Sequence, residues 1–526
     1  MTLKQASQSS EIDEKLAALL TNASAVRAIA SAVEGTIGPK GLDTLLVDRF
    51  GEVVITNDGM TILTKMDVNH PAAKMVINTA RAQEEEVGDG TTTATIMAGG
   101  LLSEGVNQAA RGVPVTRIID GVKAGVKRAL EVVEERAVKI SGVDDPILRE
   151  VALVAGRDNK DIADLVFSAA KMVGKEKLME SRFKLSETII AKEGAENEVF
   201  AGIIVDKERL NEEMPESVLD PKILAVDDAL EPEEVEEEAL ATEAGFQRYL
   251  EMQEEFRTNL AKVVSLGVRF VVVDKGIADI AEEALTDAGV MTVTRVSSAE
   301  LRKVCEHTGA RAIKRTGLRK PAEELAKYLG SAEKVFEDQK LENIRILGGK
   351  GKPMATILVG ASTGEVRGER ERICTDAASS VQAAVKGGVV AGGGAVELCC
   401  AREVEKMRLS QKGMQAYGLL CVVEALKRPM AQIVANAGFN PLEKVGDAMA
   451  RQAETGSDNL AVDCDTGEIV DMMKLGVMDP ALVKSHALKA ALEIACAILR
   501  IDTIIKKKDE GPKMGESKDS LEEMEF

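Results

Sequence analysis

Aromatic side chains are nearly absent from this sequence. It contains no Trp, and Phe and Tyr make up only 2% of its 526 residues. A chain of this length is expected to form several domains, and 45% of its residues are hydrophobic, so their cores must be built mainly from Ala, Val, Ile, Leu and Met. Because such residues pack well between helices, the composition favours a helix-rich multidomain protein.

Patterns that bind metals or form disulfides are also missing. The three histidines, His70, His307 and His486, are too scattered in sequence to indicate a zinc site. The seven cysteines are odd in number and show no CxxC spacing. We therefore expect reduced thiols buried in apolar segments rather than a disulfide framework.

Basic residues are outnumbered, with 67 Lys and Arg against 87 Asp and Glu and a formal net charge of −20. Such a surface repels phosphate backbones, so nucleic acid is not an expected partner. No basic-then-apolar leader opens the chain, and no apolar run reaches the length of about 18 residues that a membrane span needs. These absences predict a cytoplasmic protein without a membrane partner.

Two familiar nucleotide-binding motifs are lacking. No GxxxxGK[ST] motif occurs, which disfavours a Walker-type NTPase. The run "GGVVAGGGA" (387–395) lacks the GxGxxG spacing of dinucleotide-binding proteins, and no suitably placed acid follows it. A dinucleotide-dependent enzyme is therefore the less favoured alternative.

One short stretch that is present, "EVGDGTTTATIM" (86–97), combines glycines, an acid and three threonines. Glycines before a helix expose backbone N–H groups at the positive end of the helix dipole, which suits a phosphate. Asp89 could hold Mg²⁺, which takes one or two carboxylates together with phosphate oxygens. Taken alone, the motif could equally be a hairpin turn or a helix capped by Thr91.

Other glycine loops and acids follow the same theme. "TIGPKG" (36–41) is a loop after a helix, and "VVAGGGAVE" (389–397) is a glycine loop before one. Asp58 lies on the turn that ends a β-hairpin, and Asp376 is interpreted as lying at the start of a helical run. The bland alternatives are a plain helix stop, a tight helix-packing turn, and aspartates that cap helices or form turns.

The apolar periodicity divides the chain into three parts. Helices are expected at 25–33, 72–86, 91–110 and 116–138, and the chain is helical again after about 365. From 201 onwards, β-branched runs such as "KILAVDD", "VRFVVVD" and "ATILVGA" alternate with helices, which is typical of an α/β domain. The simplest arrangement is a helical domain built from both ends of the chain with an α/β domain inserted between them.

Taken together and in order, six motifs make the sequence resemble the chaperonin family, in particular its archaeal thermosome and eukaryotic cytosolic branch: "TIGPKGLDTLLVD", "VVITNDGMTIL", "HPAAKMV", "EVGDGTTTATIMAG", "VVAGGGAVE" and "LGVMDP". The resemblance extends from about residue 20 to 505. It implies a multidomain α and α/β fold with an α-helical equatorial domain, a small α/β intermediate domain, and an α/β apical domain with a helical protrusion. The implied boundaries are 1–140 and 396–526 (equatorial), 141–207 and 355–395 (intermediate), and 208–354 (apical), with the protrusion at about 229–264.

The resemblance also implies a function. Chaperonins hydrolyse ATP to ADP and phosphate and use it to enclose non-native polypeptides in a double-ring chamber, here with eight subunits in each ring. The protrusion would act as a built-in lid, so that no separate lid co-chaperonin is needed. The implied cofactors are ATP/ADP and Mg²⁺, with K⁺ as a further candidate. A nucleotide-dependent structural ring without folding activity is the other alternative.

The resemblance assigns roles to individual residues. Asp58 and Asp376 are the implied catalytic residues and Asp89 the implied Mg²⁺ ligand. The implied nucleotide-binding residues are Thr36, Gly38, Pro39, Gly88, Asp89, Gly90, Thr91, Thr92, Thr93, Gly393, Gly394 and Asp479, and the candidates for sensing the γ-phosphate are Lys160 and Arg157.

Three features depart from the common patterns of the family. Asn57 stands where the bacterial chaperonins with a detachable lid have lysine. The "VAGRDNKDI" stretch (154–162) is shorter than the phosphate-sensing loop of thermosomes. The tail from Lys506 is charged, lacks Gly-Met repeats and is expected to be disordered. These traits indicate the divergent group III chaperonins of bacteria.

Overall fold

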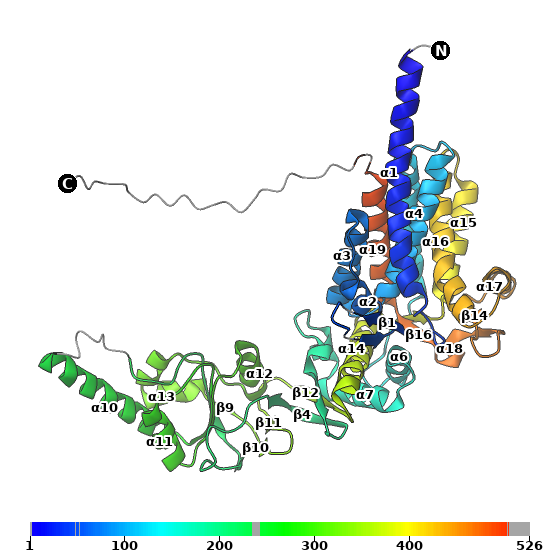
Figure 1. Cartoon of the computed structure of the whole chain (residues 1–526). Coiled ribbons are helices and arrows are strands. Elements are labelled where there is room, and N and C mark those ends of the chain that lie inside the picture. The colour runs from blue at the N-terminus through cyan, green and yellow to red at the C-terminus, as the bar shows by residue number, and fades with distance from the viewer. Residues whose placement is uncertain (1–2, 48, 52, 234–241, 502, 504–526) are drawn as a thin grey trace, which may run out of the picture.

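The computed structural model describes residues 3–47, 49–51, 53–233, 242–501 and 503. Figure 1 shows three regions in a row: a bundle of long helices, a smaller middle region around α14 (Gly364–Gly387), and an α/β region from which α10 (Glu243–Ser265) extends. The chain leaves the bundle after α5 (Val115–Arg136) and returns to it with strand β13 (Val389–Ala391), just before α15 (Ala395–Ser410). The nested arrangement expected from the periodicity is therefore present.

The bundle packs helices from both ends of the chain around one aliphatic core, in which Val33, Leu63 and Ile118 are fully buried. Two short hairpins and a two-stranded pairing lie at its inner end. Besides α5 and α15, its elements are α1 (Leu3–Glu34), β1 (Thr44–Val47), β2 (Val53–Thr56), α2 (Gly59–Lys65), α3 (Pro71–Val87), α4 (Thr91–Ala110), β13 (Val389–Ala391), α16 (Gln415–Asn436), α17 (Pro441–Thr455), β14 (Leu460–Val462), β15 (Ile469–Asp471), α18 (Met472–Leu475), β16 (Met478–Pro480) and α19 (Ala481–Leu499).

The middle region has a separate core, which α14 shares with the helices and strands around it. Cys374 and Val381 of α14 are fully buried there, so one face of this helix is fixed by apolar packing. The other elements of the region are α6 (Ile147–Ala155), α7 (Lys160–Val173), α8 (Lys175–Met179), η1 (Leu185–Thr188), β3 (Ile189–Glu193), β4 (Glu198–Val205) and β12 (Ala355–Ala361).

A six-stranded sheet with the order β3-β12-β4-β11-β10-β5 connects the middle region to the outer one, because β3 and β12 contribute to the middle core and β10 and β5 to the outer core. A second sheet, β8-β7-β6-β9, lies within the outer region, with β6, β7 and β8 parallel. The outer elements are β5 (Ser217–Leu219), β6 (Lys222–Val226), α10, β7 (Val268–Val273), α11 (Asp279–Asp287), β8 (Met291–Val293), α12 (Ser298–Thr308), η2 (Arg315–Arg319), α13 (Ala322–Leu325), η3 (Ala326–Tyr328), β9 (Gly330–Ser331), β10 (Lys334–Asp338) and β11 (Asn343–Leu347).

Most of the expected elements are present, with two corrections. The helix expected at 25–33 begins as early as Leu3, because the preceding sequence contains no Gly or Pro to interrupt it. Asp376 does not lie at the start of a helix but in the middle of α14, which begins after the capping residue Thr363. The interpretation failed because "ICTDAASS" resembles a helix start, whereas the apolar packing of α14 extends further upstream.

The acidic insert projects over only part of its length. The second half of α10 packs Phe256, Leu260 and Val263 into a second apolar core of the outer region, and Leu230 is buried with them. Phe246 and Leu250 in the first half of α10 are exposed. Residues 234–241 of the predicted protrusion lie outside the described residues, as does the charged tail from 506 onwards.

All seven cysteines are free thiols, and five of them are buried. Cys305 and Cys464 are only partly buried. Among the described helices, none is long and apolar enough to cross a membrane.

Candidate active site

The Gly88-Asp89-Gly90 segment, called the GDG junction below, joins α3 to α4. Gly88 ends α3 with φ 73°, and Gly90 precedes α4 with φ 83°. Both angles lie in the left-handed region, where a side chain causes strain. A Cβ on Gly88 would lie 2.4 Å from Ser379 Oγ, and a Cβ on Gly90 would lie 2.6 Å from Val483 Cγ1. Backbone conformation and close neighbours therefore both require glycine here.

The start of α4 leaves its first N–H groups uncapped by a side chain. The alternative that Thr91 caps this helix is wrong, because the N-cap is Gly90, which has no side chain that could cap the helix. The hairpin alternative is also wrong, since the junction lies between two helices. Thr91 is buried, while Thr92 and Thr93 are partly exposed. The helix N-terminus thus offers N–H groups and the positive end of its dipole to an anion.

Asp89 is held by hydrogen bonds at both carboxylate oxygens. The Gly90 N–H donates to Oδ1 at 2.6 Å, and the Ser380 hydroxyl donates to Oδ2 at 2.7 Å. Burial raises the pKa of Asp89, although these two hydrogen bonds act in the opposite direction. Because Ser380 belongs to α14, this contact joins the middle region to the helical bundle.

Asp58 is the N-cap of α2. Its Oδ2 accepts a hydrogen bond from the Thr61 N–H at 2.7 Å, and its own N–H donates to Thr56 Oγ1 at 3.1 Å. Asp58 is thus a helix cap, as the bland alternative held, whatever further role it has. The other carboxylate oxygen, Oδ1, is directed toward α14, where it lies 3.9 Å from Arg372 Nη1.

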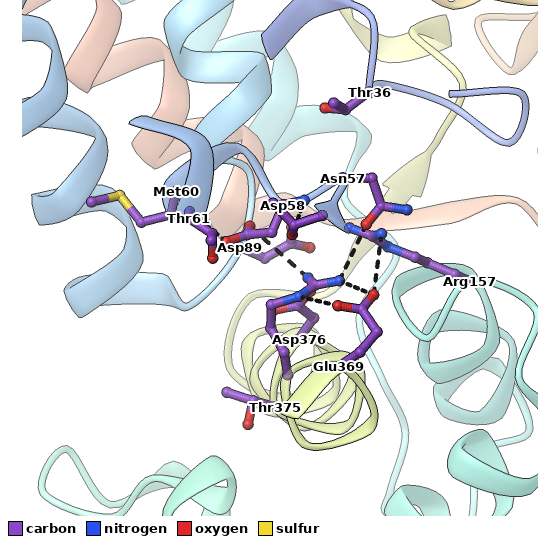
Figure 2. A network of polar contacts seen from close by, with 12 residues as sticks. Thr36, Asn57, Asp58, Met60, Thr61, Asp89, Arg157, Glu369, Thr375 and Asp376 are labelled. Atoms are coloured by element: carbon purple, nitrogen blue, oxygen red, sulfur yellow. Dashed lines mark hydrogen bonds and ion pairs between the residues drawn. The ribbon is translucent and has the colours of Figure 1, made fainter. Parts of the chain in front are cut away.

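Asp376 reaches the same place from α14. Its Oδ2 accepts a hydrogen bond from Arg372 Nη1 at 2.8 Å. Burial raises the pKa of Asp376 well above its usual range. Arg372 opposes that shift, whereas Asp89, Glu84 and Asp58 add to it. Figure 2 shows the side chains of Asp58, Asp89 and Asp376 converging from separate parts of the chain. We call Asp58, Glu84, Asp89 and Asp376 the acid cluster.

Three members of this site were not predicted from the sequence: Glu84, Glu369 and Arg372. Glu84 lies on α3, and burial, followed by repulsion from Asp58 and Asp89, raises its pKa to about 7. Arg372 is one helical turn before Asp376 and was identifiable in principle, because an arginine at i and an aspartate at i+4 face each other on a helix. Nothing local in the sequence indicated Glu84.

Replacing Glu84 by Gln is expected to stabilise the protein at pH 8 but not at pH 4. The pKa of Glu84 in the folded protein lies above the ordinary value of 4.5, so the folded state binds more protons than the unfolded state. The free energy of unfolding therefore falls as pH rises from 4.5 through 7. Removing the charge should add about 1–2 kcal/mol to the free energy of unfolding at pH 8, allowing for solvent screening.

Urea unfolding at the two pH values, without nucleotide and with a chelator, measures this difference. The exposed neighbour Glu85, replaced by Gln, is the matched control. An equal gain at both pH values would contradict the assignment of the effect to Glu84 ionisation.

Comparison with known proteins identifies the family. The sequence profile of the TCP-1/cpn60 chaperonin family matches residues 29–509. The chain belongs to this family.

Relatives of the chaperonin cover nearly its whole length. It is 36% identical over 520 residues to thermosome subunit beta of Archaeoglobus fulgidus, with 96% of this chain and 94% of that protein covered. It is 34% identical over 513 residues to thermosome subunit alpha of Thermoplasma acidophilum, covering 94% and 92%. The crystal structure of a group III chaperonin in the open state matches with a TM-score of 0.86 and 48% identity, covering 94% of this chain and 100% of that chain.

These findings confirm the main predictions made from the motifs. The fold is the multidomain α and α/β chaperonin fold, and the protein is an ATP-dependent chaperonin with a built-in lid whose ATPase is coupled to protein folding. Family membership also implies nucleotide binding, a double-ring assembly and non-native polypeptides as substrates. The dinucleotide-dependent enzyme is thereby excluded.

Two further glycine loops of the chaperonin lie beside the acid cluster without joining it. In the first, the Thr36 hydroxyl donates to the Val33 carbonyl at 2.8 Å, and the exposed Gly38, before Pro39, has φ 87°. Asn436 Nδ2 donates to the Ile37 carbonyl at 2.9 Å and so ties this loop to α16. Figure 2 shows Thr36 apart from the acid cluster.

The second loop contains Gly393, with φ 62°, and Gly394, the N-cap of α15 with φ 85°. A Cβ on Gly394 would lie 2.7 Å from Met430 Cβ, so this loop is a tight helix-packing turn. Next to it, Asp479 Oδ2 lies 2.7 Å from Lys484 Nζ, which also contacts Glu397 at 2.8 Å. This buried lysine fixes the Asp479 carboxylate.

The two candidate phosphate sensors of the chaperonin lie differently. Lys160 is exposed at the first turn of α7. Arg157 has a positive φ of 53° and is directed toward the acid cluster, as Figure 2 shows. Its Nη1 atom is buried without a hydrogen-bond partner among the described residues, and lies 3.9 Å from Glu369 Oε1. Burial also lowers the pKa of Arg157.

Proposed function

We propose that the GDG junction and the acid cluster form the site at which this chaperonin hydrolyses ATP. The observation that carries the proposal is the contact between α14 and the GDG junction, where Ser380 donates to Asp89 and Asp376 faces the same space. The backbone N–H groups of Asp89 and of Thr91 to Thr93 would hold phosphate oxygens, and Gly88 and Gly90 would shape the turn that presents them. An Asp376→Ala protein tests the proposal, because it should still bind ATP but lose its hydrolysis.

In this proposal Asp58 and Asp376 orient the attacking water, and one of them accepts its proton. The water oxygen bonds to the γ-phosphorus while the bond from that phosphorus to the ADP oxygen breaks. The raised pKa of Asp376 makes its carboxylate a stronger base, which suits a proton acceptor. Arg157, whose buried Nη1 atom has no hydrogen-bond partner among the described residues, is favoured over Lys160 as the ligand of the γ-phosphate.

The acid cluster fits a divalent cation. Burial raises the pKa of Glu84, Asp89 and Asp376, and repulsion within the cluster adds to this for Glu84 and Asp376. A bound cation would relieve both effects. The described residues include no group of three or more His, Cys, Asp or Glu able to hold a metal alone. Asp89 together with phosphate oxygens therefore suits Mg²⁺, which would neutralise phosphate charge. K⁺ is proposed as a second cation.

The remaining nucleotide contacts are proposed from the two flanking loops. Thr36, Gly38 and Pro39 would approach the phosphates from the end of α1. Gly393 and Gly394 would lie along the ribose and base. The Asp479 carboxylate, which Lys484 holds, would accept hydrogen bonds from the ribose hydroxyls.

For the double ring we propose eight subunits in each ring. The β1–β2 hairpin supports lateral association, because Leu45, Val47, Val53 and Ile55 are exposed on a two-stranded sheet. An exposed apolar hairpin with unpaired edges can pair with a strand of another chain. We also propose a cytoplasmic location and the domain boundaries given above, which largely follow the separate apolar cores.

We propose that the lid is the projecting part of the 229–264 insert and needs no separate co-chaperonin. Its support is the first half of α10, which extends from the outer region in Figure 1 and exposes Phe246 and Leu250. The buried second half of α10 would anchor it.

Replacing residues 234–250 by a short Gly-Ser linker tests the lid. ATP hydrolysis should stay within about twofold, because the excised segment is remote from the acid cluster. ATP-dependent refolding of a chemically denatured monomeric enzyme should fall to the spontaneous yield. Leu230 and Phe256 are kept, since both are buried in the outer core.

The matched control is Leu219→Ser, at an exposed apolar position of the outer region that belongs to β5 and not to α10. Negative-stain class averages should show eightfold rings for both proteins. Full refolding activity in the excised protein would show that the insert is a solvated arm rather than a lid.

A further inference from the structure

Arg372 lies at the centre of the polar network around Asp376. Its Nε and Nη2 atoms donate to the two carboxylate oxygens of Glu369 at 3.1 and 2.6 Å. Its Nη1 donates to Asp376 at 2.8 Å and lies 3.9 Å from Asp58 Oδ1. Nη2 also donates to Asn57 Oδ1 at 3.3 Å. One guanidinium therefore contacts four residues.

This contact pattern separates Arg372 from a phosphate ligand. An arginine has five N–H donors in a rigid fork, and every nitrogen of Arg372 already faces an oxygen of this chain. Arg157 differs, because its buried Nη1 atom makes no hydrogen bond to the described residues and only lies 3.9 Å from Glu369 Oε1. The two arginines thus have different roles, with Arg372 directed at the acids and Arg157 available to an anion.

The contacts of Arg372 cross from one region to another. Asn57 and Asp58 belong to the turn before α2 in the helical bundle, whereas Arg372 belongs to α14 in the middle region. Positions 372, 376 and 380 recur every four residues, so they share one face of α14. Ser380 on this face donates to Asp89. Arg372 and Ser380 therefore attach α14 to the bundle on either side of Asp376.

The acid cluster needs this cation. Asp376 faces Glu84 from α3, Asp89 from the GDG junction and Asp58 from the turn before α2, and all three disfavour its charged form. Arg372 is the cation that opposes them most directly. Arg157 is the next cation, and the Glu369 carboxylate lies beside both arginines. Removing one partner of a buried, hydrogen-bonded charge pair leaves the other uncompensated.

We propose that Arg372 is a positioning residue for ATP hydrolysis, which ties α14 to the Asn57-Asp58 turn and holds the Asp376 carboxylate where it meets the attacking water. The inference rests on the proposed function of Asp376. Arg372 does not touch the nucleotide, and it acts through the placement of the aspartate. Loss of Arg372 should therefore slow the chemical step without weakening ATP binding.

Arg372→Gln tests this role against Arg370→Gln. Arg370 is a fair control because it lies on the same helix with 22% of its side chain exposed, against 18% for Arg372, and pairs with Asp161 away from the acid cluster. In Arg372→Gln, kcat should fall by about 30- to 100-fold while KM for ATP changes less than about threefold, as expected for a misplaced catalytic group. The kcat of Arg372→Lys should lie between those of the wild type and Arg372→Gln.

A second readout needs no ATP. Amide hydrogen exchange in residues 57–61 and 372–380 should be faster in Arg372→Gln than in wild type, because the attachment between α14 and the turn is lost. Arg370→Gln should leave exchange in residues 57–61 unchanged. An Arg372→Gln protein with wild-type kcat and unchanged exchange overturns the inference.

Two further variants separate the possible failures. An Asp376→Ala protein that hydrolyses ATP normally overturns the proposed function itself. If Asp376→Ala is inactive while Arg372→Gln keeps its kcat, only the positioning role falls. Should Arg372→Gln not fold, the double variant with Glu369→Gln removes the carboxylate left without its main partner, and it should show the same loss of kcat. Wild-type kcat in that double variant overturns the inference.

Discussion

Replacing Asp376 by Ala is expected to slow ATP hydrolysis by about 100- to 10,000-fold, the range that a positioned proton acceptor contributes. Asp376 lies on the face of α14 that meets the GDG junction, and burial and three neighbouring acids raise its pKa. Those properties suit a group that receives a proton from water as the bond to phosphorus forms. ATP affinity should change by less than about tenfold, since the phosphates are held by backbone N–H groups.

Single-turnover hydrolysis and equilibrium ATP binding separate these two effects. Thr375→Ala is the matched control, because Thr375 is the preceding residue of α14 and its hydroxyl donates to the Glu371 carbonyl of the same helix. Figure 2 shows its side chain directed away from the acid cluster. If Asp376→Ala hydrolysed ATP at the wild-type rate, its catalytic assignment would be wrong.

Replacing Gly90 by Ala is expected to weaken ATP binding by at least about tenfold. A Cβ at φ 83° costs about 1–2 kcal/mol, and it would lie 2.6 Å from Val483 Cγ1, so the start of α4 has to shift. The first-turn N–H groups of α4 would then no longer converge on one phosphate position. Isothermal titration with ATP measures the loss.

Gly112→Ala separates strain from displacement. Gly112 follows the other end of α4 with φ 91°, but a Cβ there would have no neighbouring atom within 4 Å among the described residues. It should therefore lose similar stability and keep ATP affinity within about twofold of wild type. Equal loss of ATP affinity in both variants would mean that global destabilisation, and not the shape of the GDG junction, explains the effect.

Much of the fold was predictable because its signals are local. The run "ATILVGA" forms β12 over the same residues, Ala355–Ala361, and the "DTLLVD" and "EVVITND" runs pair as the predicted hairpin. β-branched runs and turn residues carry such information within a few positions. The start of α1 was missed because the stretch before Ala25 has no clear apolar periodicity, although nothing in it interrupts a helix.

The candidate site was predictable only in its glycines and some of its acids. Gly88 and Gly90 are required by backbone angles that sequence patterns indicate well. Asp376 was singled out, but its setting within α14 was misjudged, and Arg372 and Glu84 were overlooked. Glu84 matters because folding buries it near Asp58 and Asp89. Arg372 matters because, beyond its partners on α14, it reaches Asn57 and Asp58 some 315 positions away, which no local pattern encodes.

The sequence alone therefore determined which segments become helices, strands and glycine turns, and its ordered motifs indicated the family. Only the tertiary structure decided that α14 lies against the GDG junction, so that Asp376 and Ser380 face Asp89. It also decided that Arg157 rather than Lys160 is directed at the acids. The physical reason is that these outcomes depend on the packing of separate apolar cores, which sets the distances between charges remote in sequence.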